Sequence, residues 1–189
     1  MEETRRRILN VALQVLGENP DAGMGEIASA AGVVRRTVYG YFPTRSDLVL
    51  TLARQAVEEI TAELEQVTSS PERPDALWAR FVSRLWPVAH RYRVLLALRR
   101  GEYGDEIHAL LGSVDEGLTA LVQKGQHDSV FGRHLPATVL SQLAYAAVFT
   151  IADTGRAGDS LSLRAATIAS LLTLGVPEAR AEALADAQE

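Results

Sequence analysis

The 189-residue sequence contains no cysteine, which excludes disulfide bonds, thiolate metal sites and cysteine nucleophiles. It also lacks a long hydrophobic run. The longest one, from Leu143 to Ala152, is interrupted by Thr150 and followed by Asp153, whereas a membrane span needs about 18 apolar residues. The first residues carry charges of both signs in place of the unbroken apolar stretch of a signal peptide. We therefore expect a cytoplasmic protein with no membrane segment.

Acidic residues exceed basic ones, and the formal net charge is −5. The distribution is uneven, because residues 1–45 contain six arginines against five acidic residues, while the rest of the chain carries a net charge of −6. This pattern is typical of a DNA-binding module fused to a domain with another role. Arg5, Arg6 and Arg7 lie at the start of the first predicted helix, where the helix dipole disfavours cations. A nearby DNA phosphate would explain them, and so would a solvated helix end balanced by Glu2 and Glu3.

Patterns typical of strands are scarce, and apolar residues recur three and four positions apart along almost the whole chain, which predicts an all-α fold. Pro87 predicts a kink in one of the helices. Thr44 and Asp47 have the spacing of a capping box at the start of a long helix. We predict helices over residues 4–17, 24–31, 34–41, 46–67, 75–98, 102–124, 137–154 and 160–174, with a helix-prone tail from residue 177.

The two short predicted helices between residues 24 and 42 form a helix-turn-helix. Gly32 separates them and is able to take the positive φ that is common after helix C-termini. In this motif the second helix enters the major groove of DNA and the first braces it. The apolar positions that hold the two helices together are Met24, Ile27, Ala28, Ala31 and Val33.

The second short helix is rich in hydrogen-bond donors. Val38 and Phe42 are four residues apart and can face the core. Arginine side chains can bind guanine edges, and hydroxyl groups suit phosphates. The alternative interpretation is a surface helix with packed tyrosines. We predict DNA contacts by Arg35, Arg36, Thr37, Tyr39, Tyr41, Arg45 and Arg5.

The first 50 or so residues resemble the TetR family of repressors in residue type and spacing. The resemblance is carried by Arg-Ile-Leu at 7–9, by Glu-Ile-Ala-Ser-Ala-Ala-Gly-Val at 26–33, and by Thr-Val-Tyr-Gly-Tyr-Phe-Pro-Thr-Arg-Ser-Asp-Leu at 37–48. It implies a dimer that binds a palindromic operator and is released by a small ligand. It also implies that Arg35 and Arg36 lie where bases are read, and that the DNA backbone is bound by Thr37, Tyr39, Tyr41 and Arg45.

Two features depart from the family pattern. The family usually has a small hydroxyl residue where this chain has Val34, so the recognition helix lacks a cap that is typically worth about 0.5–2 kcal/mol. It also usually has hydroxyl residues at the positions of Ala22 and Gly23. These departures keep open an alternative function, namely a helical ligand-binding or interaction protein that has kept the fold but lost specific DNA binding.

The two predicted helices at 137–154 and 160–174 are apolar on more than one face, which indicates burial on two sides. One side can face the subunit's own core and the other a second copy, and a twofold dimer would match a palindromic operator. The alternative is a monomer core that buries both sides. The predicted dimer residues are Leu140, Leu143, Ala147, Ile151, Ala165, Ile168, Ala169 and Leu172.

Aromatic residues gather in the middle of the chain and predict a ligand pocket inside the helical bundle. Each of them could instead be an ordinary core residue. The ligand would be fairly large and apolar or aromatic. The predicted pocket residues are Trp78, Phe81, Trp86, Tyr92 and Tyr103, closed by Tyr145 and Phe149.

Other classes of site lack support in the sequence. His108 follows Asp105 by three residues, and His127 and His134 lie in a polar link, but such spacings are more typical of surface residues than of metal ligands. We recognise no phosphate loop or nucleophile elbow, so we predict neither an enzyme nor a cofactor. The sequence predicts a DNA-binding domain over residues 1–47. A ligand-binding and dimerisation domain would occupy residues 48–189.

Overall fold

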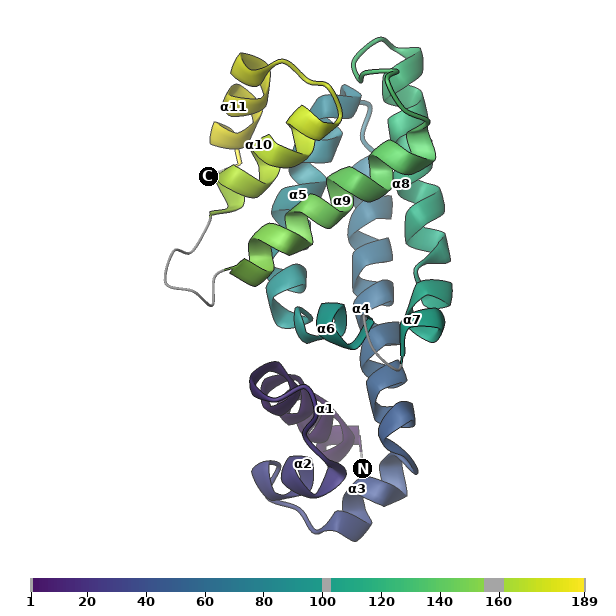
Figure 1. Ribbon diagram of the computed structural model, residues 1–189, viewed down its shortest axis with the longest axis vertical. Coiled ribbons are helices and arrows are strands. Elements are labelled where there is room, and N and C mark those ends of the chain that lie inside the picture. The colour runs from purple at the N-terminus through teal and green to yellow at the C-terminus, as the bar shows by residue number, and fades with distance from the viewer. Residues whose placement is uncertain (1, 100–102, 155–161, 189) are drawn as a thin grey trace. The chain divides into compact units, whose positions relative to one another are not determined.

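The structure is a computed structural model that describes residues 2–99, 103–154 and 162–188. These residues form helices and turns and include no strand, which confirms the all-α prediction. Within them, no helix is long and apolar enough to cross a membrane. The helices are α1 Glu2–Glu18, α2 Met24–Ala30, α3 Arg35–Tyr41, α4 Arg45–Thr68, α5 Pro74–Arg91, α6 Val94–Arg99, α7 Gly104–Leu110, α8 Gly112–His127, α9 Ala137–Thr154, α10 Leu163–Thr173 and α11 Glu178–Asp186 (Figure 1).

Contacts divide the chain into two compact units. Unit 1 comprises the residues up to 56 together with residues 91–110, and unit 2 comprises residues 57–90 and those from 111 onward. Helix α4 passes from the first unit into the second at residue 57. The compact units therefore differ in extent from the predicted functional domains 1–47 and 48–189, which stay a prediction.

Unit 1 is built around α1, which contacts α2 and α6. One apolar stripe of α1 is buried and consists of Ile8, Leu9, Ala12 and Leu16. Gly32 has a φ of +65°, as expected for the residue that separates α2 from α3. The predicted capping box is formed at the start of α4, because the backbone N–H of Asp47 donates to Thr44 Oγ1 (3.0 Å) and that of Thr44 donates to Asp47 Oδ2 (2.9 Å).

Unit 2 contains α5, α8, α9, α10, α11 and the part of α4 from residue 57 onward. Helix α9 packs against both α8 and α10, and α10 packs against α11 (Figure 1). The core of unit 2 contains the fully buried side chains of Trp78 and Phe81 from α5, whose rings meet edge to face with centroids 6.2 Å apart. The indole N–H of Trp78 donates to Ser170 Oγ on α10 (3.1 Å), which satisfies both buried polar groups.

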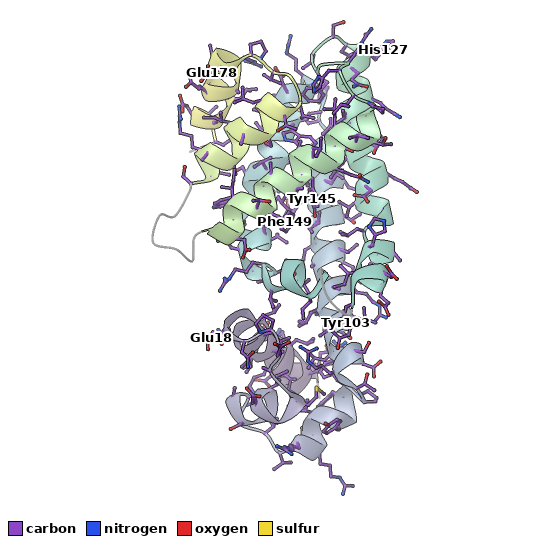
Figure 2. The ribbon with its side chains drawn as sticks, viewed as in Figure 1. Glu18, Tyr103, His127, Tyr145, Phe149 and Glu178 are labelled. Atoms are coloured by element: carbon purple, nitrogen blue, oxygen red, sulfur yellow. The ribbon has the colours of Figure 1, made fainter. Side chains whose placement is uncertain are left out.

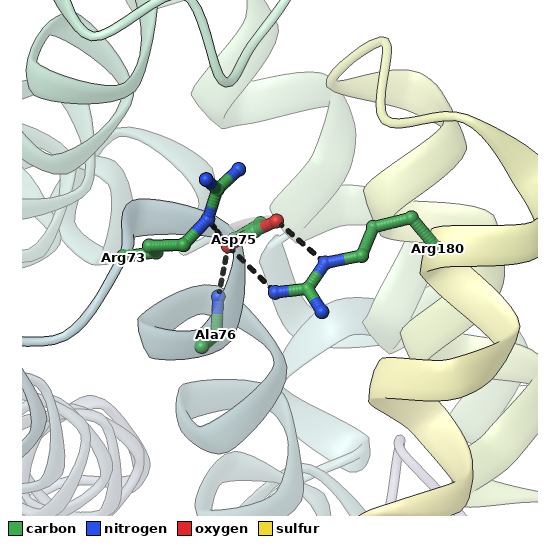
Figure 3. Close-up of polar contacts among 4 residues, drawn as sticks. All are labelled: Arg73, Asp75, Ala76 and Arg180. Atoms are coloured by element: carbon green, nitrogen blue, oxygen red, sulfur yellow. Dashed lines mark hydrogen bonds and ion pairs between the residues drawn. The ribbon is translucent and has the colours of Figure 1, made fainter.

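Asp75, at the start of α5, is a buried charge that the sequence analysis did not identify. Its Oδ2 accepts from Arg180 Nε on α11 (3.0 Å), and its Oδ1 lies 3.4 Å from Arg73 Nε (Figure 3). Burial alone raises the pKa of the Asp75 carboxyl, but the hydrogen bonds from Arg180 and Arg73 outweigh it and hold that pKa below its ordinary value. The hydrogen bond between Arg180 and Asp75 connects α11 to the start of α5.

Two predicted helices are each divided in the structure. The helix predicted over 75–98 is wrong as a single element, because a turn at residues 92–93 separates α5 from α6. In one straight helix Val94 would point almost opposite to Tyr92, whereas with the turn both side chains are buried. The helix predicted over 102–124 breaks at residue 111, immediately before Gly112, a poor helix former. The predicted start of the helix 160–174 lies outside the described residues.

Candidate nucleic-acid interface

Helices α2 and α3 form the predicted helix-turn-helix. Ile27 and Ala28 of α2 and Val38 of α3 are buried, and Phe42 after α3 is buried as well. The backbone N–H of Val33 donates to the carbonyl of Ala28 (3.0 Å), which closes the end of α2. Because Val38 faces the core, the opposite side of α3 is left to solvent.

The two arginines at the start of α3 are exposed. Within the described part of the chain, neither guanidinium forms a hydrogen bond or an ion pair. The side chain of Arg35 lies across Gly25 of α2, where an added Cβ would come within 2.5 Å of Arg35 Nη2. Arg36 is two residues from buried Val38 and therefore points away from the core. Both side chains keep their donors for an outside acceptor.

The hydroxyl residues predicted to bind DNA differ in exposure. Tyr39 is 48% exposed, while Thr37 and Tyr41 are half-buried. The ring of Tyr41 lies 6.4 Å from that of Phe42, centroid to centroid. These residues share one short helix, so the structure brings Arg35, Arg36, Thr37, Tyr39 and Tyr41 together.

Arg45, at the start of α4, makes contacts within unit 1 that the sequence did not predict. Its Nη1 donates to the hydroxyl of Tyr103 (2.9 Å), its Nε donates to the carbonyl of Ala22 (3.2 Å), and its Nη2 donates to the carbonyl of Pro20. Its guanidinium also lies 5.6 Å from the centroid of the Tyr103 ring. Arg45 thus ties the turn before α2 to the residue that precedes α7.

Arg5 also has a role inside unit 1. It is half-buried, and its guanidinium lies 5.5 Å from the centroid of the Phe42 ring. Glu2 lies one turn earlier on α1, with its Oε1 4.0 Å from Arg5 Nη1. The sequence could not show these contacts, because Phe42 is 37 positions away along the chain.

The two departures from the family pattern affect how α2 and α3 are capped. Val34 is the N-cap residue of α3 and forms no side-chain cap. Gly23 caps α2 without a side chain, and its backbone N–H donates to Glu26 Oε1 instead (3.3 Å). Ala22 is fully buried, where its methyl group packs in the core of unit 1.

The aromatic residues predicted to line one pocket are divided between the compact units. Tyr92 and Tyr103 belong to unit 1, and the other five belong to unit 2. Tyr145 and Phe149 lie one turn apart on α9 with ring centroids separated by 4.8 Å (Figure 2). The ring of Trp86 meets that of His90 at 4.4 Å. All except half-buried Trp86 are buried side chains.

Unit 2 contains a groove of about 350 Å³ between α4, α5 and α8. Its floor is mainly apolar and includes Leu64, Leu77 and Leu121, and Glu65 and Lys124 lie at its edges. Gly117 allows α8 to approach α4 closely, because a Cβ at this position would lie 2.7 Å from Leu64 Cδ2. None of the predicted aromatic residues lines this groove.

The predicted dimer residues occupy α9 and α10, with unequal exposure. Leu140 is fully buried and belongs to the subunit core, whereas Leu143 is 48% exposed and Leu172 is 43% exposed. The other predicted members are half-buried: Ala147, Ile151, Ala165, Ile168 and Ala169. Sequence reasoning missed Val139, one turn before Leu143, which is also exposed.

The fold and the exposed arginines of α3 define a helix-turn-helix protein. Residues 8–52 match the model of the family described as "Bacterial regulatory proteins, tetR family". This match confirms, for the N-terminal part of the chain, the resemblance to the TetR family identified from the sequence.

Named relatives agree with this assignment. The chain is 43% identical over 81 residues to the HTH-type transcriptional repressor LfrR of Mycolicibacterium smegmatis, covering 43% of each chain. It is 37% identical over 78 residues to the HTH-type transcriptional regulator AcrR of Shigella flexneri, covering 39% of this chain and 35% of that protein. The matched segments therefore span less than half of either relative. Both are regulators by name, in agreement with the prediction that this chain is not an enzyme.

A solved structure resembles almost the whole chain. The crystal structure of LfrR from Mycobacterium smegmatis, in complex with proflavine, has a TM-score of 0.72 and 26% identity to this chain. The similarity covers 92% of this chain and 95% of that one. The likeness thus extends beyond the helix-turn-helix into the helices that follow it.

Proposed function

We propose that this protein is a cytoplasmic, homodimeric transcriptional repressor that binds a palindromic DNA operator through α3. The observation that carries the proposal is the pair Arg35 and Arg36, exposed at the start of the second helix of a helix-turn-helix. Guanidinium groups in that position can donate two hydrogen bonds to guanine O6 and N7. Tyr39, Tyr41 and Thr37 supply hydroxyls for the backbone phosphates, as the family resemblance implies.

The dimer is supported by the outward side of α9. Val139 and Leu143 lie four residues apart on that side and are exposed, and Leu172 of α10 is exposed as well. Large apolar side chains on an acidic body are well suited to a second protein surface. A twofold dimer would place one α3 helix in each of two major grooves about 34–36 Å apart.

We infer that a small, largely apolar ligand releases the repressor from DNA, and the groove between α4, α5 and α8 is the site we propose for it. Its volume of about 350 Å³ is within the range of small-molecule sites, about 300–1,000 Å³. The leucines and the charged Glu65 and Lys124 of its lining suit an apolar body with a polar or charged substituent. The aromatic residues of α5 and α9 stay a second proposal for the ligand wall.

DNA binding is tested by fluorescence anisotropy with DNA from upstream of the protein's own gene, unrelated competitor DNA and a salt series. We expect saturable binding that survives the competitor and weakens about ten- to hundredfold in Arg36→Ala. The matched control is Arg54→Ala, which removes an exposed arginine of α4 in the same unit. Equal, salt-sensitive binding to every duplex would contradict a specific repressor.

Ligand binding is tested with proflavine, the compound bound in the LfrR structure. We expect Ala120→Phe, which fills the groove from an exposed position of α8, to weaken proflavine binding. Ala183→Phe, at an exposed position of α11, should leave it unchanged. In the wild type, proflavine should reduce operator affinity by roughly five- to 150-fold, the usual range of allosteric coupling. Tight proflavine binding with unchanged operator affinity would refute release by this compound.

A further inference from the structure

Val34, the residue before α3, has an exposed side chain with no function inside the subunit. It is 69% exposed, the highest value among the large hydrophobic residues in the described part of the chain. Its backbone is extended, with φ −75° and ψ 150°, and its side chain forms no cap. A hydroxyl residue at this position would stabilise the helix. The Val34 side chain therefore contributes neither to the core nor to the capping of α3.

The surroundings of Val34 are cationic and open. Arg35 and Arg36 follow it directly and are exposed. Gly40 is one turn after Arg36 on the same outer side of α3, and nothing lies within 4 Å of a Cβ added there. Because Gly40 has no side chain, a partner can approach this side of the helix closely.

We propose that Val34 binds the C5-methyl group of a thymine in the operator, next to the base pairs contacted by Arg35 and Arg36. Val34 would then be a specificity-determining residue. The thymine methyl is the apolar group that base pairs present in the major groove, and apolar side chains recognise it by contact. Phosphates do not suit a valine, because they are bound by hydrogen-bond donors. The flanking arginines identify the partner as nucleic acid.

This inference rests on the proposed operator binding and predicts one feature of the operator. Each half-site contains a thymine whose methyl group contributes to affinity at a position adjacent to an arginine contact. Losing one buried methyl group typically changes an equilibrium constant about fourfold. The effect is therefore smaller than the loss of an arginine contact and confined to one position of each half-site.

The experiment uses the full-length protein and a duplex that it selects from a random pool. Each thymine of one half-site is replaced in turn by deoxyuridine, which pairs identically but lacks the methyl group. We expect the wild type to lose about fourfold in affinity at one thymine and to be unaffected at the others. Val34→Ala should bind the thymine and deoxyuridine duplexes equally at that position.

Two further variants separate recognition from folding. Leu135→Ala shortens another exposed apolar side chain, in the segment between α8 and α9, and should keep the wild-type sensitivity to deoxyuridine. Val34→Ser adds a helix cap while removing both methyl groups, so it should be at least as stable as the wild type and still lose that sensitivity.

The outcomes distinguish the two proposals. If no deoxyuridine substitution affects the wild type, or if Val34→Ala and Val34→Ser keep the effect, Val34 does not bind a thymine methyl. Repression would remain supported in that case as long as Arg36→Ala weakens binding. If no duplex is selected, or if Arg36→Ala binds like the wild type, the operator proposal itself fails and this inference fails with it.

Discussion

Both compact units expose large apolar side chains, but the charges around them differ. In unit 1, Val34 and Tyr39 on or beside α3 are next to exposed Arg35 and Arg36. In unit 2, Leu143 lies on α9, a helix without a basic residue among its 18 residues. By exposure alone, both regions would be interaction surfaces of the same kind. The neighbouring charge distinguishes them, since cations attract DNA and an uncharged apolar helix face suits another protein surface.

The largest effect is expected from charging the apolar face of unit 2. The double variant Leu143→Glu with Leu172→Glu should convert the dimer to a monomer, because four buried carboxylates would meet at a twofold interface. Operator affinity should fall by about a hundredfold or more, since the two half-sites would no longer be bound together. Light scattering measures the mass of the protein, and fluorescence anisotropy measures its affinity for the operator.

A matched control adds a charge away from α9 and α10. Gln123→Glu changes an exposed polar residue of α8 and should leave both mass and affinity unchanged. A double variant that remains dimeric would show that α9 and α10 are not the interface. The difference between the apolar surfaces of the two units would then need another explanation.

The comparison also explains what the sequence could reveal. In unit 1 the helix-turn-helix was predictable because its signals are local: Gly32 between two short apolar patterns, and a capping box from Thr44 to Asp47. The neighbours of Arg45 were not predictable, because Tyr103 is 58 positions away and the fold alone brings it close. Helix α3 therefore lies where the sequence predicted it, whereas Arg45 and Arg5 have internal contacts that the sequence did not predict.

In unit 2 the binding sites were harder to predict from the sequence than the helices. Its helices follow from apolar spacing, but the spacing does not say which aromatic side chains line a cavity and which fill the core. Trp78 and Phe81 are fully buried against each other and against Ser170. The groove is instead lined by residues that include three leucines and Gly117 but none of the predicted aromatic side chains. Asp75 was missed because its partner Arg180 comes from a helix 105 residues later.

Each unit contains one charged side chain that ties distant segments together, Arg45 in unit 1 and Asp75 in unit 2. Asp75→Asn should lower the free energy of unfolding by about 2 kcal/mol, because the hydrogen bonds from Arg180 and Arg73 lose their charge. The cost stays moderate because both arginines remain partly solvated. Denaturant unfolding measures this change in the free energy of unfolding. The control is Glu72→Gln in the partly exposed ion pair with Arg80, which should cost much less than Asp75→Asn.

The Asp75 effect should also depend on pH in a defined direction. The folded-state pKa of Asp75 is lowered from its ordinary value of 3.8, so its ionised form stabilises the fold at pH values above 3.8. That contribution is lost as the pH falls through the folded-state pKa. The stability difference between wild type and Asp75→Asn should be constant from about pH 7 to 5 and shrink below about pH 4. A difference that grew on acidification would contradict the assigned charge state.

Arg45→Ala tests the corresponding contact of unit 1. It removes three hydrogen bonds and should cost about 1–2 kcal/mol of unfolding free energy. Tyr103→Phe removes one of them and should cost less. The salt dependence of operator binding separates the two roles of Arg45: a phosphate contact predicts that the slope of log affinity against log salt falls by about one unit in Arg45→Ala. An unchanged slope would make Arg45 a residue of the fold alone.

The smallest effect is expected at Val34, the exposed apolar residue of unit 1 that lies beside Arg35 and Arg36. Val34→Thr has nearly the same shape and adds a hydroxyl that can accept a hydrogen bond from the backbone N–H of Arg36 or Thr37. We expect a gain of about 0.5–1 kcal/mol in unfolding free energy. The control Val57→Thr places the same change in the interior of α4, away from a capping position, and should give no gain. If Val34→Thr also failed to stabilise the protein, the start of α3 would already be satisfied by solvent, and the missing cap would carry no cost that operator recognition has to offset.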